Sequence, residues 1–192
     1  MARPREFDGD SILDKAVEAF RGKGYEGTSL TVLEKATGLG RASLYGAYGD
    51  KRALYLAALR RYDATRSLRL LASLNEARTG RAALECLFAA VIGESVRDPR
   101  GCLLACAASE RAAHDEGVAR CVEGNRRRME GGLAAAILRG RADGSVKRRG
   151  DDARTAARFL FAAVLGLRAL AKAGCGKSEL EGVAAEALRT LD

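Results

Sequence analysis

The sequence predicts an all-α fold. Only two prolines, Pro4 and Pro99, occur in 192 residues, so helices can run unbroken over long stretches. Alternating β-branched runs between turn residues, which would indicate strands, are missing. A hydrophobic fraction of 47% and a charged fraction of 30% are typical of a soluble globular protein. With 5% aromatic residues and no Trp, the residues left to fill the core are Leu, Ala and Val.

The first helix is indicated by apolar residues that recur at helical spacing from Ile12 to Phe20, with charged residues on the other face. We expect Gly22 and Gly24 to end it, because glycine commonly closes a helix.

A short second helix should follow. Its start is ambiguous by a residue or two, because the hydroxyls of Thr28 and Ser29 can cap it, whereas Thr31 followed by Glu34 also fits a capping box. Gly38 should end this helix, since a tight turn needs a positive φ that other residues adopt at a cost.

A third short helix is expected from about Arg41 to Tyr48, and Asp50 can cap a fourth helix from Lys51 to roughly Ser73. Two short helices joined by a tight turn and held on an amphipathic helix form the helix-turn-helix unit that binds DNA.

The third helix would provide the DNA-reading surface. Leu33, Ala36 and Leu44 supply the inward wedge that sets the crossing of the helix pair. Short side chains on the outward face let the backbone approach base edges, and an Arg there can reach a guanine or a phosphate. The residues that this face offers to the major groove are Arg41, Ala42, Ser43, Tyr45 and Gly46.

The rest of the chain predicts longer helices, separated by Gly- and Pro-containing turns. Their expected ranges are about 80–96, 101–112, 115–141, 151–173 and 178–191.

Charge and targeting signals narrow the class of protein. The net charge is +8, and residues 41–61 hold five basic residues against one acidic residue, which permits an anionic partner. No signal peptide and no membrane-length apolar run are visible, so we expect a cytoplasmic protein without membrane contact. The five cysteines should be reduced there, and neither their spacing nor the single His indicates a metal site or a cofactor.

The motif order over about residues 8–60 resembles the TetR family of transcriptional regulators. It reads Gly-Tyr-x-x-Thr-Ser, a short helix, Gly-Leu-Gly, and Arg-x-Ser-Leu-Tyr-x-x-Tyr-x-x-Lys. The resemblance implies that Tyr45, Tyr48 and Lys51 anchor the groove and the phosphates, and that Thr28 or Ser29 begins the second helix on a phosphate.

Two positions depart from the family pattern. Ala47 stands where the family often has His, and Tyr48 where Phe is commoner. We expect a changed operator preference and an unchanged binding mode.

The resemblance also implies a division into a helix-turn-helix DNA-binding domain, residues 1–52, and a helical ligand-binding and dimerisation domain, residues 53–192. Two apolar stripes near the C-terminus suit a dimer, although ordinary core would look the same. A two-fold dimer would set two reading helices about 34 Å apart, one turn of DNA. The stripes are Phe159, Ala163, Gly166, Leu167 and Leu170, and Leu180, Val183, Ala184, Ala187 and Leu188.

The segment after Pro99 offers a candidate thiol sensor. Cys102 is expected in the first turn of a helix, where the helix dipole and neighbouring Arg100 favour a thiolate, with Cys106 on the same side. The run Gly-Cys-Leu-Leu is similar to one branch of the TetR family, in which some members sense electrophiles or oxidants through this cysteine. The alternative is a cysteine that only fills core space, beside a pocket for a small apolar ligand.

The remaining cysteines, Cys86, Cys121 and Cys175, have the pattern of core or loop residues.

We therefore predict a homodimeric regulator, a repressor released from double-stranded operator DNA by a small-molecule effector or a thiol-reactive species. One alternative is a helical interaction module that does not bind DNA. The other is a thiol enzyme using Cys102, which we do not expect, because the only His, His114, lies twelve residues away in the sequence.

Overall fold

A computed structural model describes residues 9–147 and 152–192, and every regular element in these ranges is helical. The all-α prediction is therefore confirmed. The elements are α1 (Gly9–Gly27), α2 (Leu30–Thr37), α3 (Arg41–Tyr48), α4 (Lys51–Tyr62), a π-helical turn η1 (Asp63–Ser67), α5 (Leu68–Ser73), α6 (Gly80–Arg97), α7 (Leu103–Glu110), α8 (Glu116–Ala142), α9 (Ala153–Lys172) and α10 (Lys177–Arg189).

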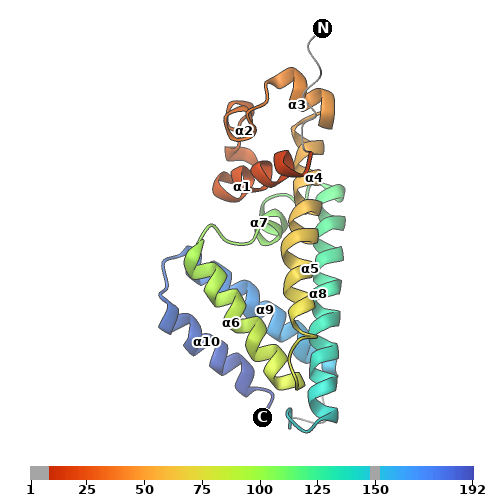
Figure 1. Ribbon diagram of the computed structural model, residues 1–192, viewed down its shortest axis with the longest axis vertical. Coiled ribbons are helices and arrows are strands. Elements are labelled where there is room, and N and C mark those ends of the chain that lie inside the picture. The colour runs from red at the N-terminus through yellow and green to blue at the C-terminus, as the bar shows by residue number, and fades with distance from the viewer. Residues whose placement is uncertain (1–8, 148–151) are drawn as a thin grey trace.

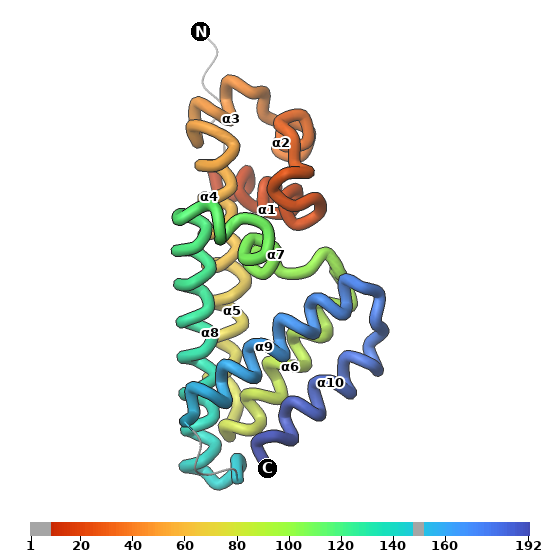
Figure 2. The backbone as a smooth tube through the Cα atoms, turned by 180° about the vertical axis from the view of Figure 1, so that it is seen from behind, coloured from red at the N-terminus to blue at the C-terminus, as the bar shows by residue number. Residues whose placement is uncertain are grey.

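The helices form two groups joined by a long connection (Figure 1). The N-terminal unit, α1–α3, lies at one end of the molecule. The helical body consists of α5, α6, α8, α9 and α10 at the other end. The run α4–η1–α5 lies beside α8 and links the two groups, and α7 lies between α1 and the body in both views (Figure 2).

Two hydrophobic cores correspond to these groups. The first core packs Phe20 of α1 and Leu44 of α3 against Tyr55 of α4 and Leu103 of α7. The second joins α5, α6, α8, α9 and α10. The N-terminal core therefore extends past residue 52, the boundary that the sequence predicts, because α4 and α7 complete it.

The regular part of the first helix ends at Gly24, one of the two glycines that the sequence predicts, because the backbone there leaves the helical region with φ at +69°. Beyond this kink a further helical turn continues α1 to Gly27. The kink is stabilised from outside the helix, because the amide of Tyr25 donates to the carboxylate of Glu110 in α7 at 3.1 Å. A contact 85 residues away in the sequence is invisible to helical periodicity.

The expected fourth helix runs from Lys51 to Ser73 without a break, but it contains the π-helical turn η1. Inside this turn the hydroxyl of Thr65 donates to the carbonyl of Arg61 at 2.8 Å. The predicted cap is confirmed, since the Asp50 carboxylate accepts from the amide of Ala53 at 2.7 Å.

The body depends on one close helix crossing. A Cβ added at Gly80, at the start of α6, would lie 2.2 Å from the backbone nitrogen of Gly140 in α8. Only glycine permits this approach of α6 to α8.

Within residues 9–147 and 152–192, no helix has both the length and the apolarity that crossing a bilayer requires. Over the same ranges, no three His, Cys, Asp or Glu side chains are gathered in a way that could hold a metal ion.

Candidate nucleic-acid interface

The candidate interface is formed by α2, α3 and the turn between them. Leu33 of α2 and Leu44 of α3 are fully buried, and Gly38 ends α2 with φ at +78°. The backbone amide of Arg41 also donates to the carboxylate of Glu34 at 2.7 Å, which ties the first turn of α3 to α2. Ala36 is only half-buried, so the inward wedge rests on the two leucines.

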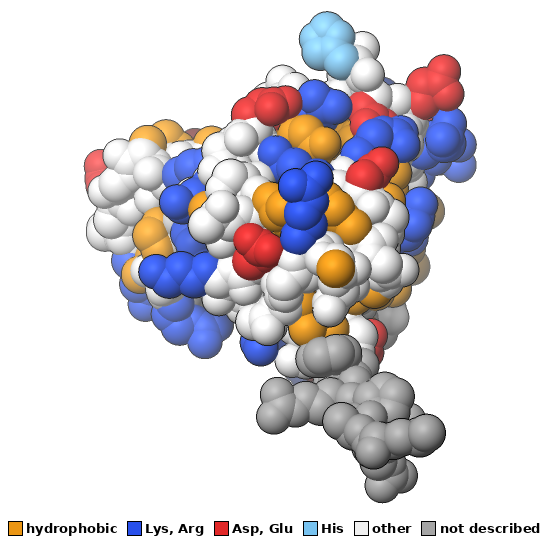
Figure 3. Space-filling model, turned by 90° about the horizontal axis from the view of Figure 1, so that it is seen from above, with side chains coloured by type: hydrophobic (Ala, Val, Ile, Leu, Met, Phe, Trp, Pro, Cys, Tyr) orange, Lys and Arg blue, Asp and Glu red, His pale blue; other side chains and the backbone are white. Residues whose placement is uncertain are grey.

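The outward face of α3 is open. Its short side chains and Arg41 are exposed, and a Cβ at Gly46 would meet no other atom within 4 Å. Figure 3 views the molecule from this end, where Lys and Arg side chains lie among uncharged side chains and several Asp and Glu side chains. Helix backbone can therefore approach a partner closely, and cations border the approach. The exposed short residues are Ala42, Ser43, Gly46 and Ala47.

The two tyrosines of α3 are half-buried. Tyr45 packs on the N-terminal core, and the guanidinium of Arg41 lies 5.8 Å from the centre of its ring. The hydroxyl of Tyr48 donates to the carbonyl of Gly9 at 3.3 Å, and burial raises the pKa of this phenol. Both rings therefore help to hold α3 on the N-terminal core.

Lys51 begins α4 beside α3. Its ammonium lies 4.3 Å from the ring centre of Tyr25, and the guanidinium of Arg111 lies 4.5 Å from the same ring. Arg111 is neutralised by Glu26 at 3.0 Å. These described contacts leave Lys51 without a carboxylate partner, so its charge is available to an anion.

Thr28 and Ser29 have different roles. Thr28 is fully buried, and its hydroxyl donates to the carbonyl of Gly24 at 2.6 Å, so the structure corrects the expectation that it could reach a phosphate. Ser29 is exposed and caps α2, accepting from the amide of Val32 at 3.3 Å. This cap also excludes Thr31 as the start of α2.

Cys102 is the N-cap residue of α7, one position before the first turn in which the sequence places it. It is half-buried and lines a narrow cavity with Tyr62, Asn125 and Arg168. Arg100 does not pair with it, because its guanidinium binds the carboxylates of Asp98 and Glu18. The cations that share a cavity with this thiol are Arg66 and Arg168.

Cys106 is a weaker candidate for a thiolate. It is half-buried in α7, and burial raises the pKa of its thiol, although the ammonium of Lys172 at 3.8 Å opposes that shift. A protonated thiol is a poor nucleophile.

The other cysteines do not all match the expected pattern. Cys86 is exposed on α6, so it is neither core nor loop. Cys121 packs on the N-terminal core and Cys175 on the body core. His114 is exposed, and among the described residues no hydrogen bond joins it to Cys102.

The residues of the expected dimer stripes on α9 and α10 fall into an exposed part and a buried part. Phe159 is 49% exposed and Val183 37% exposed, and Leu170 is also exposed, with Ala163 and Gly166 half-buried beside them. The other half of the set lies inside the single chain and has almost no surface for a partner, because α9 and α10 use it to pack on the body core. These internal residues are Leu167, Leu180, Ala184, Ala187 and Leu188.

Sequence reasoning missed two features that depend on tertiary contacts. One is the bidentate pair between Arg52 in α4 and Asp115 at the start of α8, with N···O distances of 2.6 and 2.7 Å. The other is a cavity lined by several arginines between α1 and the body. No local pattern in the sequence brings these residues together.

Comparisons with known proteins agree on the class. A family model described as "Bacterial regulatory proteins, tetR family" matches residues 12–58. The chain is 31% identical over 195 residues to YezE of Bacillus subtilis, an uncharacterized HTH-type transcriptional regulator, with all of both chains covered. It is 30% identical to the HTH-type transcriptional repressor ComR of Escherichia coli, covering 97% of this chain and 90% of that one.

A solved structure extends the similarity to the fold. The chain matches a cysteine mutant of the TetR family regulator CifR, complexed with 26-base-pair operator DNA, with a TM-score of 0.88 and 31% identity. The match covers 99% of this chain and all of that one.

Proposed function

Because the chain belongs to the TetR family of bacterial transcriptional regulators, we propose that it is a homodimeric repressor that grips operator DNA with α2, α3 and the start of α4. The main support is the outward face of α3, where short side chains are exposed while Leu33 and Leu44 are fully buried. A helix of this kind enters the major groove and approaches base edges closely.

Each contact has a chemical reason. Arg41 supplies a guanidinium for a guanine or a phosphate at the start of α3. Ser29, which caps α2 by accepting from the amide of Val32, is exposed at a helix start, and a helix start attracts a phosphate. Lys51 supplies a cation with no carboxylate partner among the described contacts. Tyr45 and Tyr48 frame the groove-facing surface from its sides.

Dimerisation is proposed through the exposed part of α9 and α10. Phe159 and Val183 offer apolar surface, and a Cβ at Gly166 or Gly182 would meet no other atom within 4 Å. A second copy can therefore approach these helices closely. Two-fold symmetry would then present two α3 helices to successive major grooves about 34 Å apart.

Release from DNA is proposed to pass through α7, which contacts α1 at both of its ends. At the start, the guanidinium of Arg21 donates to the carbonyl of Gly101 at 3.0 and 3.1 Å. At the end, the carboxylate of Glu110 accepts from the amide of Tyr25. Cys102 lies next to Gly101, so a group added to its sulfur would displace α7 and thereby α1.

The test is fluorescence anisotropy on DNA flanking the gene of this protein, before and after alkylation with N-ethylmaleimide. We expect tight, salt-sensitive binding that is lost on alkylation and is retained after alkylation in Cys102→Ser. Binding should remain sensitive to alkylation in Cys86→Ser, which removes an exposed thiol of α6. Binding no tighter than to random DNA would contradict the repressor. Tight binding that alkylation does not change would contradict the thiol switch. Release from DNA would then require a non-covalent effector.

A further inference from the structure

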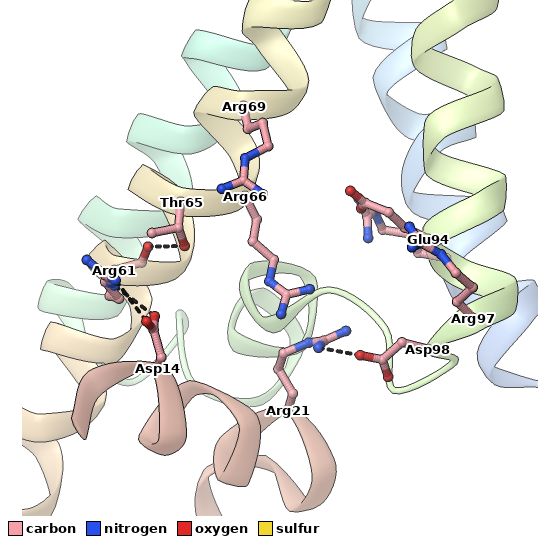
Figure 4. Close-up of a pocket in the computed structure, with 10 residues that line it drawn as sticks. Asp14, Arg21, Arg61, Thr65, Arg66, Arg69, Glu94, Arg97 and Asp98 are labelled. Carbon is pink, nitrogen blue, oxygen red and sulfur yellow. Dashed lines mark hydrogen bonds and ion pairs between the residues drawn. The ribbon is translucent and has the colours of Figure 1, made fainter. Parts of the chain in front are cut away.

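A polar cavity of about 510 Å³ lies where α1 meets the helical body (Figure 4). Its walls come from α1, from the run α4–η1–α5, from the end of α6 and from α9. This volume is within the range of pockets that hold small organic molecules. It is separate from the DNA-facing surface of α3.

The cavity is strongly cationic. Three carboxylates, from Asp14, Glu94 and Asp98, face six guanidinium groups, so its lining has a net charge of +3, and no apolar side chain is among its lining residues. Such a lining repels hydrophobic ligands and attracts anions. The guanidinium groups belong to Arg21, Arg61, Arg66, Arg69, Arg97 and Arg168.

Part of this charge is not neutralised within the protein. Arg61 is bound by Asp14 at 2.8 Å and Arg168 by Glu94 at 3.2 Å. Arg69 and Arg97, by contrast, have no carboxylate partner among the described residues, and the guanidinium of Arg97 donates to the carbonyl of Gly93. Two guanidinium groups from different elements are therefore available to a ligand.

The burial of the arginine side chains distinguishes between a small anion and nucleic acid as the ligand of this cavity. The Arg21 side chain is 3% exposed and that of Arg168 is 12% exposed, so these two groups are beyond the reach of a DNA backbone lying on the surface, whereas Arg69 and Arg97 are exposed. A small molecule with two or more anionic groups can enter and contact both walls.

The cavity also includes the π-helical turn η1, which provides Thr65 and Arg66. Such turns are costly irregularities that occur frequently at functional sites. Here the turn widens the helix that connects the N-terminal unit to the body, at the point where this helix faces the cavity.

We propose that this cavity binds a small organic anion with at least two negative charges, a phosphate ester or a polycarboxylate, and that binding weakens the grip on operator DNA. This inference rests on the proposed function. It names the chemical class of effector that would act without touching a cysteine.

The coupling follows from the ion pairs that now hold α1 against the body. Arg21 in α1 binds Asp98 after α6 at 2.7 Å. Glu18 in α1 binds Arg66 of η1 at 2.8 Å and Arg100 at 2.6 Å. A bound dianion would compete with Asp98 for Arg21 and with Glu18 for Arg66, both of which line the cavity, so α1 would lose part of its attachment and shift α3 with it.

The first experiment is calorimetric titration of the full-length protein with inorganic pyrophosphate and, separately, with tricarballylate, at constant ionic strength. The two probes distinguish a phosphate from a carboxylate ligand. Arg69→Gln/Arg97→Gln should weaken binding of the preferred probe at least tenfold, because two charge-assisted contacts are lost without breaking an internal ion pair. The control, Arg78→Gln/Arg120→Gln, removes the same charge from exposed positions outside the cavity, with the loss of one exposed ion pair between Arg120 and Glu116, and should change binding less than twofold.

The second experiment is operator anisotropy with the same proteins. The preferred probe should weaken operator binding at least threefold in the wild type and the control, and not in the cavity variant. No binding of either probe, or equal weakening in both double variants, would overturn the cavity assignment. Probe binding without an effect on operator affinity would overturn the coupling. If the wild type does not bind the operator even without a probe, the proposed function is contradicted instead, so the two failures are distinguishable.

Discussion

Helices α3 and α9 are built alike but differ in what surrounds them. Each buries leucines on one face, with Leu44 in α3 and Leu167 in α9, and presents small residues on the other. Gly46 and Gly166 both stand in open space. Arg41 borders the open face of α3, whereas exposed Phe159 borders that of α9. Small residues thus permit close approach in both cases, and under the proposed function the flanking chemistry selects DNA for α3 and a second protein chain for α9.

Placing the same carboxylate on each open face separates the two roles. Gly46→Glu should reduce operator affinity at least 100-fold, about 2.7 kcal/mol, because its charge would face phosphates and base edges. The chain should fold and dimerise normally, since a Cβ there meets no atom within 4 Å. Anisotropy measures the affinity, and Gly22→Glu, an exposed glycine of α1 with equal space, is the control. Unchanged operator affinity would exclude α3 as the reading helix.

Gly166→Glu should act through assembly. A charge buried between two copies costs more than the apolar contact returns, so we expect monomers in sedimentation velocity. Operator affinity should fall about tenfold, because the two half-sites are no longer bound together. Gly131→Glu on α8 is an exposed control, also without a neighbour within 4 Å. If Gly166→Glu remains dimeric, the interface lies elsewhere.

Lys51→Ala tests the electrostatic border of α3. Removing one phosphate contact should weaken operator binding roughly fivefold, about 1 kcal/mol, and lower the slope of log affinity against log salt by about one. The fold should tolerate the change, because the ammonium contacts only the ring of Tyr25 among its described partners. Titrations at several salt concentrations measure the slope. A slope equal to that of the wild type would assign Lys51 to the support of Tyr25 instead.

The ion pair between Arg52 and Asp115 joins α4 to the start of α8. The Arg52 guanidinium beside Asp115 lowers the pKa of that carboxyl from 3.8 to about 2. A lowered pKa in the folded state stabilises the fold above the ordinary value, and this contribution disappears as the pH falls from about 4 through about 2.

Asp115→Asn should therefore lower the free energy of unfolding by about 1 kcal/mol at pH 6, with almost no difference from the wild type near pH 2. Urea unfolding at both pH values measures this difference. Asn can still cap α8, so the substitution isolates the effect of the charge. A difference that grows toward low pH would contradict the assigned ion pair.

Local properties of the sequence account for the helix-turn-helix. The positive φ at Gly38 and the cap at Asp50 depend on neighbours a few residues away, and the helical spacing of Leu33 and Leu44 marks the face that packs on the N-terminal core, so spacing and residue type were sufficient to predict these features. The all-α class follows from the same local rules, together with the scarcity of proline.

Contacts between distant segments decided the rest. Thr28 became a buried turn residue, Leu167 and Leu180 became core, and Gly24 became a kink stabilised by Glu110. The apolar stripe of a helix has the same spacing whether its partner is the same chain or another copy, so sequence alone could not divide the dimer set. The arginine cavity joins residues of α1, η1, α6 and α9, whose charges look like ordinary solvated surface until the chain folds. Charge and burial at such a site depend on which helix faces which, and only the tertiary structure specifies that.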